Sequence, residues 1–305
     1  MATHIPGLHH VTAISGPAQA NVDFFTGTLK QRLVKKTVNF DAPDTYHLYY
    51  GNDAAEPGTI LTFFPFANAG PGRAGAGMAA AYAYAVPKGK FDGWMEELAE
   101  NVVDFLGPKE RFGERVILLR DPDGAPVELV ETDRDSDAPL DGFHSVTLWE
   151  NDIAPTARLL TDHFGWEELG HEVQDGTERL RLRAPGTARG AVVDIMRSDA
   201  PSIGRQGAGS IHHVAFRARD DAEQLEWQEK LQTAGLGVTE VRDRQYFNAI
   251  YFREPGGVLF EIATDPPGFA IDEDPAHLGE ALKLPPQYEG MRDRIERVLP
   301  PLRVA

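Results

Sequence analysis

Apolar and polar positions along the 305-residue chain switch four times between a strand-like pattern, in which they alternate, and a helix-like pattern with apolar residues three or four positions apart. The helix-like stretches cover residues 18–29, 91–102, 153–164 and 221–234. Each follows one strand-like segment and precedes about three more. The pattern therefore predicts four units of one strand, one helix and three strands, at 7–67, 77–132, 142–198 and 209–265.

Sequence matches at a single spacing indicate that these units are copies of one another. Residues 94–98, WMEEL, recur 133 positions later as WQEKL at 227–231. The same spacing aligns RDPDG at 120–124 with REPGG at 253–257, and it places Glu128 on Glu261. In the later copy, a proline and two glycines between apolar runs predict a tight turn between two strands.

We therefore expect an α+β fold in which four repeated βαβββ modules form two barrel-like cups. The sequence divides into an N-terminal pair of modules at 1–135, a C-terminal pair at 136–267 and a tail at 268–305. Helical patterns at 275–283 and 287–298, separated by Pro285 and Pro286, predict a helical tail. The tail could cap a cup or pack on its surface.

Equivalent positions in the four units carry candidate ligands. The opening strands hold His10, Ala80, Ser145 and His213, and the last strands hold Thr62, Glu128, Asp194 and Glu261. Because neighbouring side chains of a strand face opposite sides, we expect His9, His212 and the aligned His144 to face away from His10 and His213. Glu261 ends an otherwise apolar run, where a buried carboxylate is costly unless it is paired or binds a metal.

The pairing of units decides whether a complete site exists. If units one and two share a cup, His10 meets Glu128, and His213 meets Glu261 in the other cup. If units one and four share a cup, it holds His10, His213 and Glu261, with Thr62 as a fourth position that is not a ligand. Two histidines and one carboxylate form the facial triad of non-haem Fe(II) enzymes, so we expect the second pairing. Mn(II) accepts the same ligands.

Composition narrows the function further. The net charge is −17 and no long basic run is present, which disfavours a nucleic-acid partner. Without cysteine, the chain has neither disulfides nor thiolate ligands. No apolar run has membrane-spanning length, and residues 1–10 lack the features of a signal peptide. We therefore expect a cytoplasmic protein that does not contact membranes.

The repeated unit resembles the βαβββ module of the vicinal oxygen chelate superfamily, which includes glyoxalase I, bleomycin-resistance proteins and extradiol dioxygenases. The sequence YFREPGG at 251–257, followed by Glu261, is similar to the extradiol dioxygenase signature. Two positions depart from the catechol enzymes, because Arg244 and Ser145 stand where those enzymes carry histidines. At both positions the chain resembles the MhqO-like subgroup, whose members cleave the rings of hydroquinones.

This resemblance implies an Fe(II)-dependent or Mn(II)-dependent ring-cleaving dioxygenase that acts on a small aromatic para-diol with O2, and it favours a homodimer. The implied metal ligands are His10, His213 and Glu261. The implied catalytic or orienting residues around them are His9, Thr12, His212, Arg244 and Tyr251. From the residues themselves, Phe63, Phe64, Phe247 and Phe252 are candidates for an aromatic pocket, and Asn248 for a substrate contact.

Three alternative functions stay open. A catechol extradiol dioxygenase would use a similar metal centre. A glyoxalase I-like isomerase would need a second carboxylate ligand, and Thr62 occupies that position here. A binding protein of the bleomycin-resistance kind would give His10 and His213 no reason to occupy equivalent positions.

Overall fold

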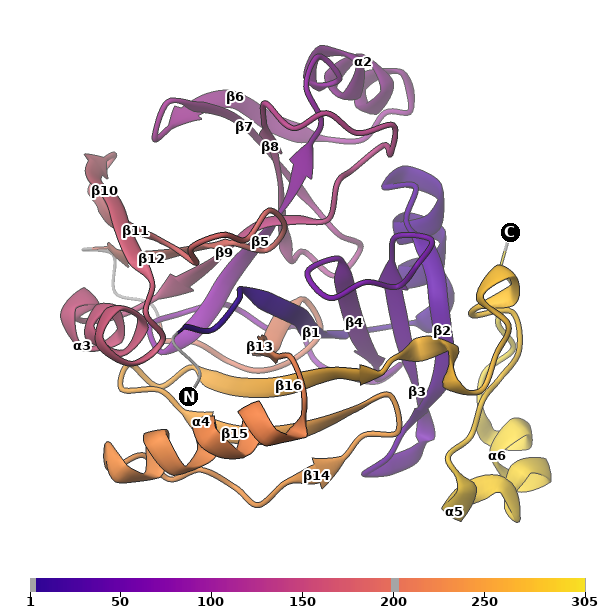
Figure 1. Cartoon of the computed structure of the whole chain (residues 1–305). Coiled ribbons are helices and arrows are strands. Elements are labelled where there is room, and N and C mark those ends of the chain that lie inside the picture. Colours follow the sequence, from indigo (N-terminus) through magenta and orange to yellow (C-terminus); the bar gives the residue numbers. More distant parts are fainter. Residues whose placement is uncertain (1–3, 199–202, 305) are drawn as a thin grey trace.

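The computed structural model describes residues 4–198 and 203–304, and it contains the four predicted βαβββ units (Figure 1). Unit one comprises β1 (Leu8–Ser15), α1 (Ala18–Val22) with the π-helical turns η1 (Asp23–Thr28), β2 (Arg32–Asn39), β3 (Ala42–Gly51) and β4 (Ile60–Pro65). Unit two comprises β5 (Met78–Val86), α2 (Phe91–Glu100), β6 (Phe105–Arg111), β7 (Glu114–Arg120) and β8 (Pro126–Glu131).

The other two units repeat this order. Unit three comprises β9 (Phe143–Trp149), α3 (Ile153–Arg158) with the π-helical turn η2 (Leu159–His163), β10 (Glu167–Gln174), β11 (Thr177–Arg183) and β12 (Val192–Ser198). Unit four comprises β13 (Ser210–Ala218), α4 (Asp221–Thr233), β14 (Arg242–Asp243), β15 (Phe247–Arg253) and β16 (Leu259–Pro267). The α+β fold class is confirmed.

The described strands form two curled eight-stranded sheets. The first sheet has the order β14-β15-β16-β13-β1-β4-β3-β2, and the second has the order β10-β11-β12-β9-β5-β8-β7-β6. Unit one thus pairs with unit four, and unit two with unit three, as the ligand argument required. Each sheet contains one unit from residues 1–135 and one from residues 136–267. The predicted boundary near residue 135 therefore separates pairs of units along the sequence, but it does not separate the two sheets.

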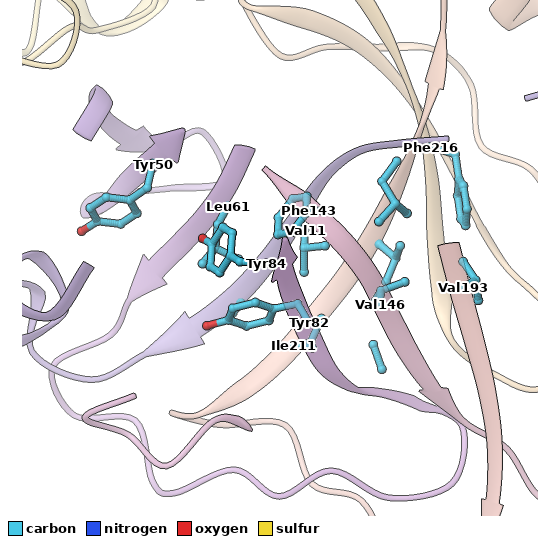
Figure 2. Close-up of a cluster of buried hydrophobic side chains, with 14 of the residues drawn as sticks. Val11, Tyr50, Leu61, Tyr82, Tyr84, Phe143, Val146, Val193, Ile211 and Phe216 are labelled. Atoms are coloured by element: carbon cyan, nitrogen blue, oxygen red, sulfur yellow. The ribbon is translucent and has the colours of Figure 1, made fainter. Parts of the chain in front are cut away.

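Alternation along the strands gives each sheet two faces. In the first sheet, Val11, Leu61 and Ile211 point into a large core that also includes the helices and the second sheet. Figure 2 shows these three side chains in one cluster with Tyr82 and Phe143 of the second sheet. The opposite, concave face of the first sheet carries the polar residues of the pocket described below and a smaller apolar cluster that includes Tyr49, Phe247 and Phe269.

The tail continues from β16 through η3 (Phe269–Ile271), η4 (Pro275–His277), α5 (Pro286–Glu289) and α6 (Arg292–Val298). Its start packs on the concave side of the cup, where Phe269 contacts Tyr49 and Phe247, whereas Ile295 and Leu299 of its end join the main core. Lys35 of β2 is fully buried and ion-paired with Asp272, 2.6 Å away, and with Glu273. The predicted helix at 275–283 was largely wrong: beyond the short η4, this segment forms turns and bends, and Leu282 then forms a bridge with Lys36 of β2.

A buried acid links the second sheet to the β15–β16 turn of the first. Glu150, just after β9, is 1% exposed, and neither carboxyl oxygen has a hydrogen-bond partner in the part of the chain that the structure describes. It packs directly on Gly256, where any Cβ would overlap the carboxyl group. The adjacent Glu254 accepts hydrogen bonds from Thr156 Oγ1 at 2.6 Å and from the backbone N–H of Val258 at 2.8 Å. Burial and the Glu254 carboxylate raise the pKa of Glu150 to about 9.

This raised pKa predicts a pH-dependent stability. Because the folded protein keeps a proton up to about pH 9 that an ordinary glutamate loses near about pH 4.3, stability falls as pH rises between these values. Glu150→Gln removes this dependence. We expect the Tm of Glu150→Gln to exceed that of the wild type increasingly from pH 5 to pH 9 in thermal unfolding. The exposed Glu240→Gln serves as control, and a constant difference across the range would contradict a protonated Glu150.

Candidate metal centre

Three buried side chains converge on the concave face of the first sheet. His10 lies on β1, His213 on β13 and Glu261 on β16. The distance between the two Nε2 atoms is 3.3 Å, and Glu261 Oε2 lies 2.9 Å from His213 Nε2 and 3.5 Å from His10 Nε2. The three potential ligand atoms all lie within 4.8 Å of one another, so this group could hold one metal ion.

Strand register explains why residues so distant in sequence meet. β1 and β13 are antiparallel neighbours at the centre of the sheet, and β16 runs parallel to β13. His10 pairs with Ala215, which in turn pairs with Glu261, so these three form one row across the strands. The small Ala215 leaves space between the two ligands. His213 lies two residues from Ala215 and therefore shares its face. Glu261 is the third residue of β16, so the expectation that it ends its strand was wrong.

The expectation that His9 and His212 face away from the ligands was also wrong. The register between β1 and β13 is shifted at both residues, which marks a bulge at each. A bulge breaks the alternation of side chains and re-aims one of them. As a result, His9 Nδ1 lies 2.9 Å from His10 Nδ1, and His212 Nδ1 lies 2.7 Å from His213 Nδ1. His10 and His213, the two candidate ligands, thus each have a histidine neighbour in hydrogen-bond contact with Nδ1.

These contacts fix the tautomers needed for metal binding. A ligand imidazole that offers Nε2 to a metal carries its proton on Nδ1. His10 and His213 would then donate from Nδ1 to the Nδ1 atoms of His9 and His212, which carry their own protons on Nε2. Burial and the neighbouring His213 lower the pKa of His212 to about 4, so His212 is a neutral acceptor at pH 7.

The environment of Glu261 fits a cation. Its side chain is 0% exposed, and among the described residues neither carboxylate oxygen has a hydrogen-bond partner beyond the facing histidines. Burial alone would raise the pKa of Glu261, but the His10 and His213 imidazoles outweigh burial and hold that pKa well below its usual range. An ionised carboxylate without other donors is costly in a buried site, and a divalent ion between the three ligands offsets that cost.

The second sheet provides an internal comparison. Its equivalent carboxylates are paired with arginines: Arg111 donates to Glu128 at 2.7 and 2.9 Å, and Arg181 donates to Asp194 at 2.7 and 2.8 Å. His144 lies at a bulge like that of His9, and its Nδ1 faces Ser145 Oγ at 3.0 Å rather than a second histidine. In the second sheet, guanidinium groups thus compensate the charge of the carboxylates, as a metal ion could do in the first sheet.

Strand pairing corrects one position of the repeat alignment. Ala83 pairs with Glu128 as Ala215 pairs with Glu261, so the equivalent of His213 in unit two is Ala81 rather than Ala80. Ala80 lies at the bulge, the place of His212. The spacing between the copies therefore differs by one residue in this strand. Both positions are alanine, so the second cup still lacks the ligand pair.

A pocket of about 480 Å³ opens beside the three ligands. Thr12, His212, Arg244 and Tyr251 line it together with the ligands, whereas His9 lies behind His10 and packs on Phe247 at a ring distance of 5.2 Å. The aromatic part of the wall is formed by Phe40, Phe64, Phe66 and Phe247.

Three other candidates do not line this pocket: Phe63 and Phe252 belong to the main core, and the Asn248 side chain donates a hydrogen bond to Asp221.

Sequence patterns missed several polar residues of this pocket, among them His47 and Tyr49 of β3. Tyr49 Oη lies 2.8 Å from His47 Nδ1, and His47 Nε2 lies 2.8 Å from Thr62 Oγ1. The available signal was the period of two along β3, which puts both side chains on one face. The position of Thr62 in the repeat alignment marked that face as the concave one.

Comparison with known proteins agrees with this architecture. The profile of the glyoxalase/bleomycin resistance protein/dioxygenase superfamily matches residues 7–129 and 142–262. The chain belongs to this superfamily. It is 46% identical over 100% of its length to MhqO of Bacillus subtilis (99% of that protein covered), a protein provisionally named a ring-cleaving dioxygenase.

Two further proteins give the same result. A chlorohydroquinone/hydroquinone 1,2-dioxygenase of Sphingobium indicum is 38% identical, with 97% of this chain and 96% of that protein covered. A crystal structure of a provisionally named dioxygenase from Bacillus subtilis superimposes with a TM-score of 0.93 at 45% identity, covering 100% of this chain and 99% of that one. The prediction of a ring-cleaving dioxygenase is confirmed at the level of this enzyme class.

The first prediction from the site concerns metal binding. His10→Ala, His213→Ala and Glu261→Ala should each lose the metal-dependent rise in Tm that the wild type shows, because each removes one of three ligands. A metal added at a hundred times its Kd stabilises the wild type by about 2.7 kcal/mol. His144→Ala is the matched control and should respond like the wild type. A normal response of His10→Ala, or a lost response of His144→Ala, would place the metal elsewhere.

Proposed function

We propose that this protein is an Fe(II)-dependent dioxygenase that cleaves the ring of hydroquinone-type aromatics with O2, and that His10, His213 and Glu261 hold the metal. The convergence of two imidazoles and one carboxylate beside an aromatic-walled pocket carries the proposal. Such a triad leaves coordination positions open for a substrate and O2. Bound Fe(II) would act as a Lewis acid toward the diol and allow electrons to pass between the diol and O2.

Arg244 and Tyr251 form the polar wall beside the ligands. Arg244 Nε donates a hydrogen bond to Tyr251 Oη at 3.1 Å, and Arg244 Nη1 lies 3.4 Å from Asp41. Because Tyr251 Oη accepts from Arg244, its own proton is available for an oxygen atom in the pocket. Burial raises the pKa of Tyr251, which keeps it a neutral hydrogen-bond donor. We propose that Tyr251 binds a substrate oxygen and that Arg244 holds Tyr251 in place.

The paired histidines have separate roles in this proposal. His9 is buried behind His10 and does not line the pocket, so it orients that ligand. His212 orients His213 but also reaches the pocket, where its Nε2–H group can donate a hydrogen bond to an oxygen atom of the substrate. Thr12 lines the pocket beside His10 and offers a hydroxyl group to the substrate.

A para-diol suits this wall better than an ortho-diol. A catechol presents two adjacent hydroxyl groups and must lose two protons to chelate a metal, so it needs a base beside the second oxygen. Arg244 stands on that wall, and a guanidinium group cannot act as a base at neutral pH. A hydroquinone presents one oxygen to the metal and needs only one deprotonation there. The hydroquinone dioxygenase from Sphingobium indicum supports this choice.

The alternative functions lack support from the site. An isomerase of the glyoxalase I type would need a fourth ligand, but Thr62 instead binds Thr12 and His47 at 2.9 and 2.8 Å. A metal-free binding protein would not require three convergent buried ligands.

Mn(II) in place of Fe(II), a homodimer and a cytoplasmic location stay predictions. No described helix is long and apolar enough to cross a membrane.

The proposal predicts a substrate preference. With the Fe(II)-loaded enzyme, kcat/KM for hydroquinone should exceed that for catechol by at least about tenfold, which corresponds to roughly 1.4 kcal/mol of transition-state preference. Oxygen consumption at low substrate concentration measures both values. Catechol can still inhibit, because chelation does not require turnover. Equal or faster turnover of catechol would refute the para-diol assignment while leaving a dioxygenase.

Tyr251 provides a separate test. Tyr251→Phe removes only the hydroxyl group, so metal content should equal that of the wild type. We expect kcat to fall by roughly 10- to 1,000-fold, because the lost hydrogen bond acts on charge that develops at oxygen. Steady-state oxygen consumption with hydroquinone measures the effect. An unchanged kcat across the pH range would show that the Tyr251 hydroxyl takes no part in the reaction and that the side chain only packs in the wall.

A further inference from the structure

One wall of the pocket carries a continuous hydrogen-bonded chain of four side chains. Thr12 Oγ1 lies 2.9 Å from Thr62 Oγ1, which lies 2.8 Å from His47 Nε2. His47 Nδ1 lies 2.8 Å from Tyr49 Oη. Each distance is that of a normal hydrogen bond. The order along the chain is therefore Thr12, Thr62, His47, Tyr49.

The strands hold this chain in a fixed order. Thr12 of β1 and Thr62 of β4 are direct parallel partners, and Thr62 is also the antiparallel partner of Tyr49 on β3. His47 lies two residues before Tyr49 and shares its face. Its ring is packed between those of Tyr49 and Phe64, with centroid distances of 4.0 and 4.3 Å. Neither end of the imidazole can turn away without breaking these contacts.

Both ends of the chain reach the pocket, as does His47, and only Thr62 among the four members does not. Thr12, His47 and Tyr49 line the pocket, whereas Thr62 is fully buried beneath it. Every member can both donate and accept a hydrogen bond, and a neutral imidazole does so through its two nitrogens. Burial, with the nearby His10 and His213 imidazoles, lowers the pKa of His47 well below its usual range. Burial raises the pKa of Tyr49, so the whole chain is neutral at pH 7.

We propose that Thr12, Thr62, His47 and Tyr49 form a proton path that carries the proton of a substrate hydroxyl from the metal end of the pocket to its Tyr49 end. This inference rests on the proposed function, because it assumes a diol at the metal centre. The arrangement gives His47 and Tyr49 a role in the reaction that neither the repeat pattern nor the ligand set assigns.

The transfer balances without a change of charge on the protein. The substrate oxygen gives its proton to Thr12 Oγ1, Thr12 passes its own proton to Thr62, and Thr62 passes its proton to His47 Nε2. His47 then releases the proton on Nδ1 to Tyr49 Oη, and Tyr49 releases its proton to a water molecule in the pocket. The four residues begin and end neutral, with every hydrogen bond reversed and His47 in its other tautomer. The substrate oxygen keeps the electron pair and becomes an anion, which a metal ion held by His10, His213 and Glu261 would bind.

A substitution of Thr62 gives the sharpest test, because it interrupts the path at a residue that does not line the pocket. Thr62→Val has the shape of threonine but no hydroxyl, and Thr62→Ser keeps the hydroxyl. In the Fe(II)-loaded enzyme with hydroquinone, Thr62→Val should lower kcat by at least about tenfold, within the range of proton-transfer catalysis. Its KM and metal content should stay within about twofold of the wild type, and Thr62→Ser should restore most of kcat.

A solvent isotope measurement separates proton transfer from packing. In the wild type, kcat should fall in D2O with a curved dependence on the deuterium fraction, because several protons move together. Thr62→Val should lose this curvature and Thr62→Ser should keep it. Equal kcat in Thr62→Val and the wild type, or equal losses in the valine and serine variants, would overturn the proton path.

The path has a second readout that needs neither metal nor turnover. In metal-free protein, ¹⁵N NMR of the His47 imidazole should show the Nε2 signal moving in Thr62→Val and the Nδ1 signal moving in Tyr49→Phe. Signals that stay in place in both variants would show that the chain does not exist in solution. Absence of oxygen consumption with every hydroquinone in the wild type would refute the proposed function itself, and the proton path would fall with it.

Discussion

A fully buried glutamate without a hydrogen-bond donor is the constraint on which the chemistry of this protein depends. Glu261 lies among apolar strand residues, and the Nε2 atoms of His10 and His213 face its carboxylate. A charge in such a place is costly unless a cation compensates it. The two histidines are themselves held at Nδ1 by bulged neighbours, so their free nitrogens point to one place. The arrangement makes sense as the surroundings of a divalent metal.

The two cups share one backbone arrangement but differ in the side chains at equivalent positions. Both cups keep the bulges in their central strands and a carboxylate in the equivalent row. In the second cup, arginines neutralise Glu128 and Asp194, and the histidine positions hold Ala81 and Ser145. Charge compensation by a guanidinium group is permanent, whereas compensation by a metal leaves open coordination positions. The difference between the two cups thus lies in a few side chains rather than in the backbone.

The repeats made much of the fold and the ligand set predictable, because copies of one unit reveal equivalent positions that a single histidine cannot. The pairing of units one and four followed from the need for a complete site. Local pattern could not reveal the bulges, since they depend on register between strands that are far apart in sequence. For the same reason His9 and His212 were expected on the wrong face, and Ala80 was aligned where Ala81 belongs. The contacts of His47 also depend on the pairing of three neighbouring strands. The tail lies outside the four units, so no equivalent copy could guide the prediction of its structure.

The central claim is that the first cup alone holds the metal. Anomalous X-ray diffraction at the iron absorption edge, from crystals of protein loaded anaerobically with Fe(II), tests it most directly. We expect one peak at about 2.0–2.3 Å from His10 Nε2, His213 Nε2 and a Glu261 oxygen, by analogy with the metal–ligand distances of similar divalent ions. We expect no peak between Arg111, Arg181 and His144 in the second cup. A peak in the second cup, or none at the three convergent ligands, would contradict the account.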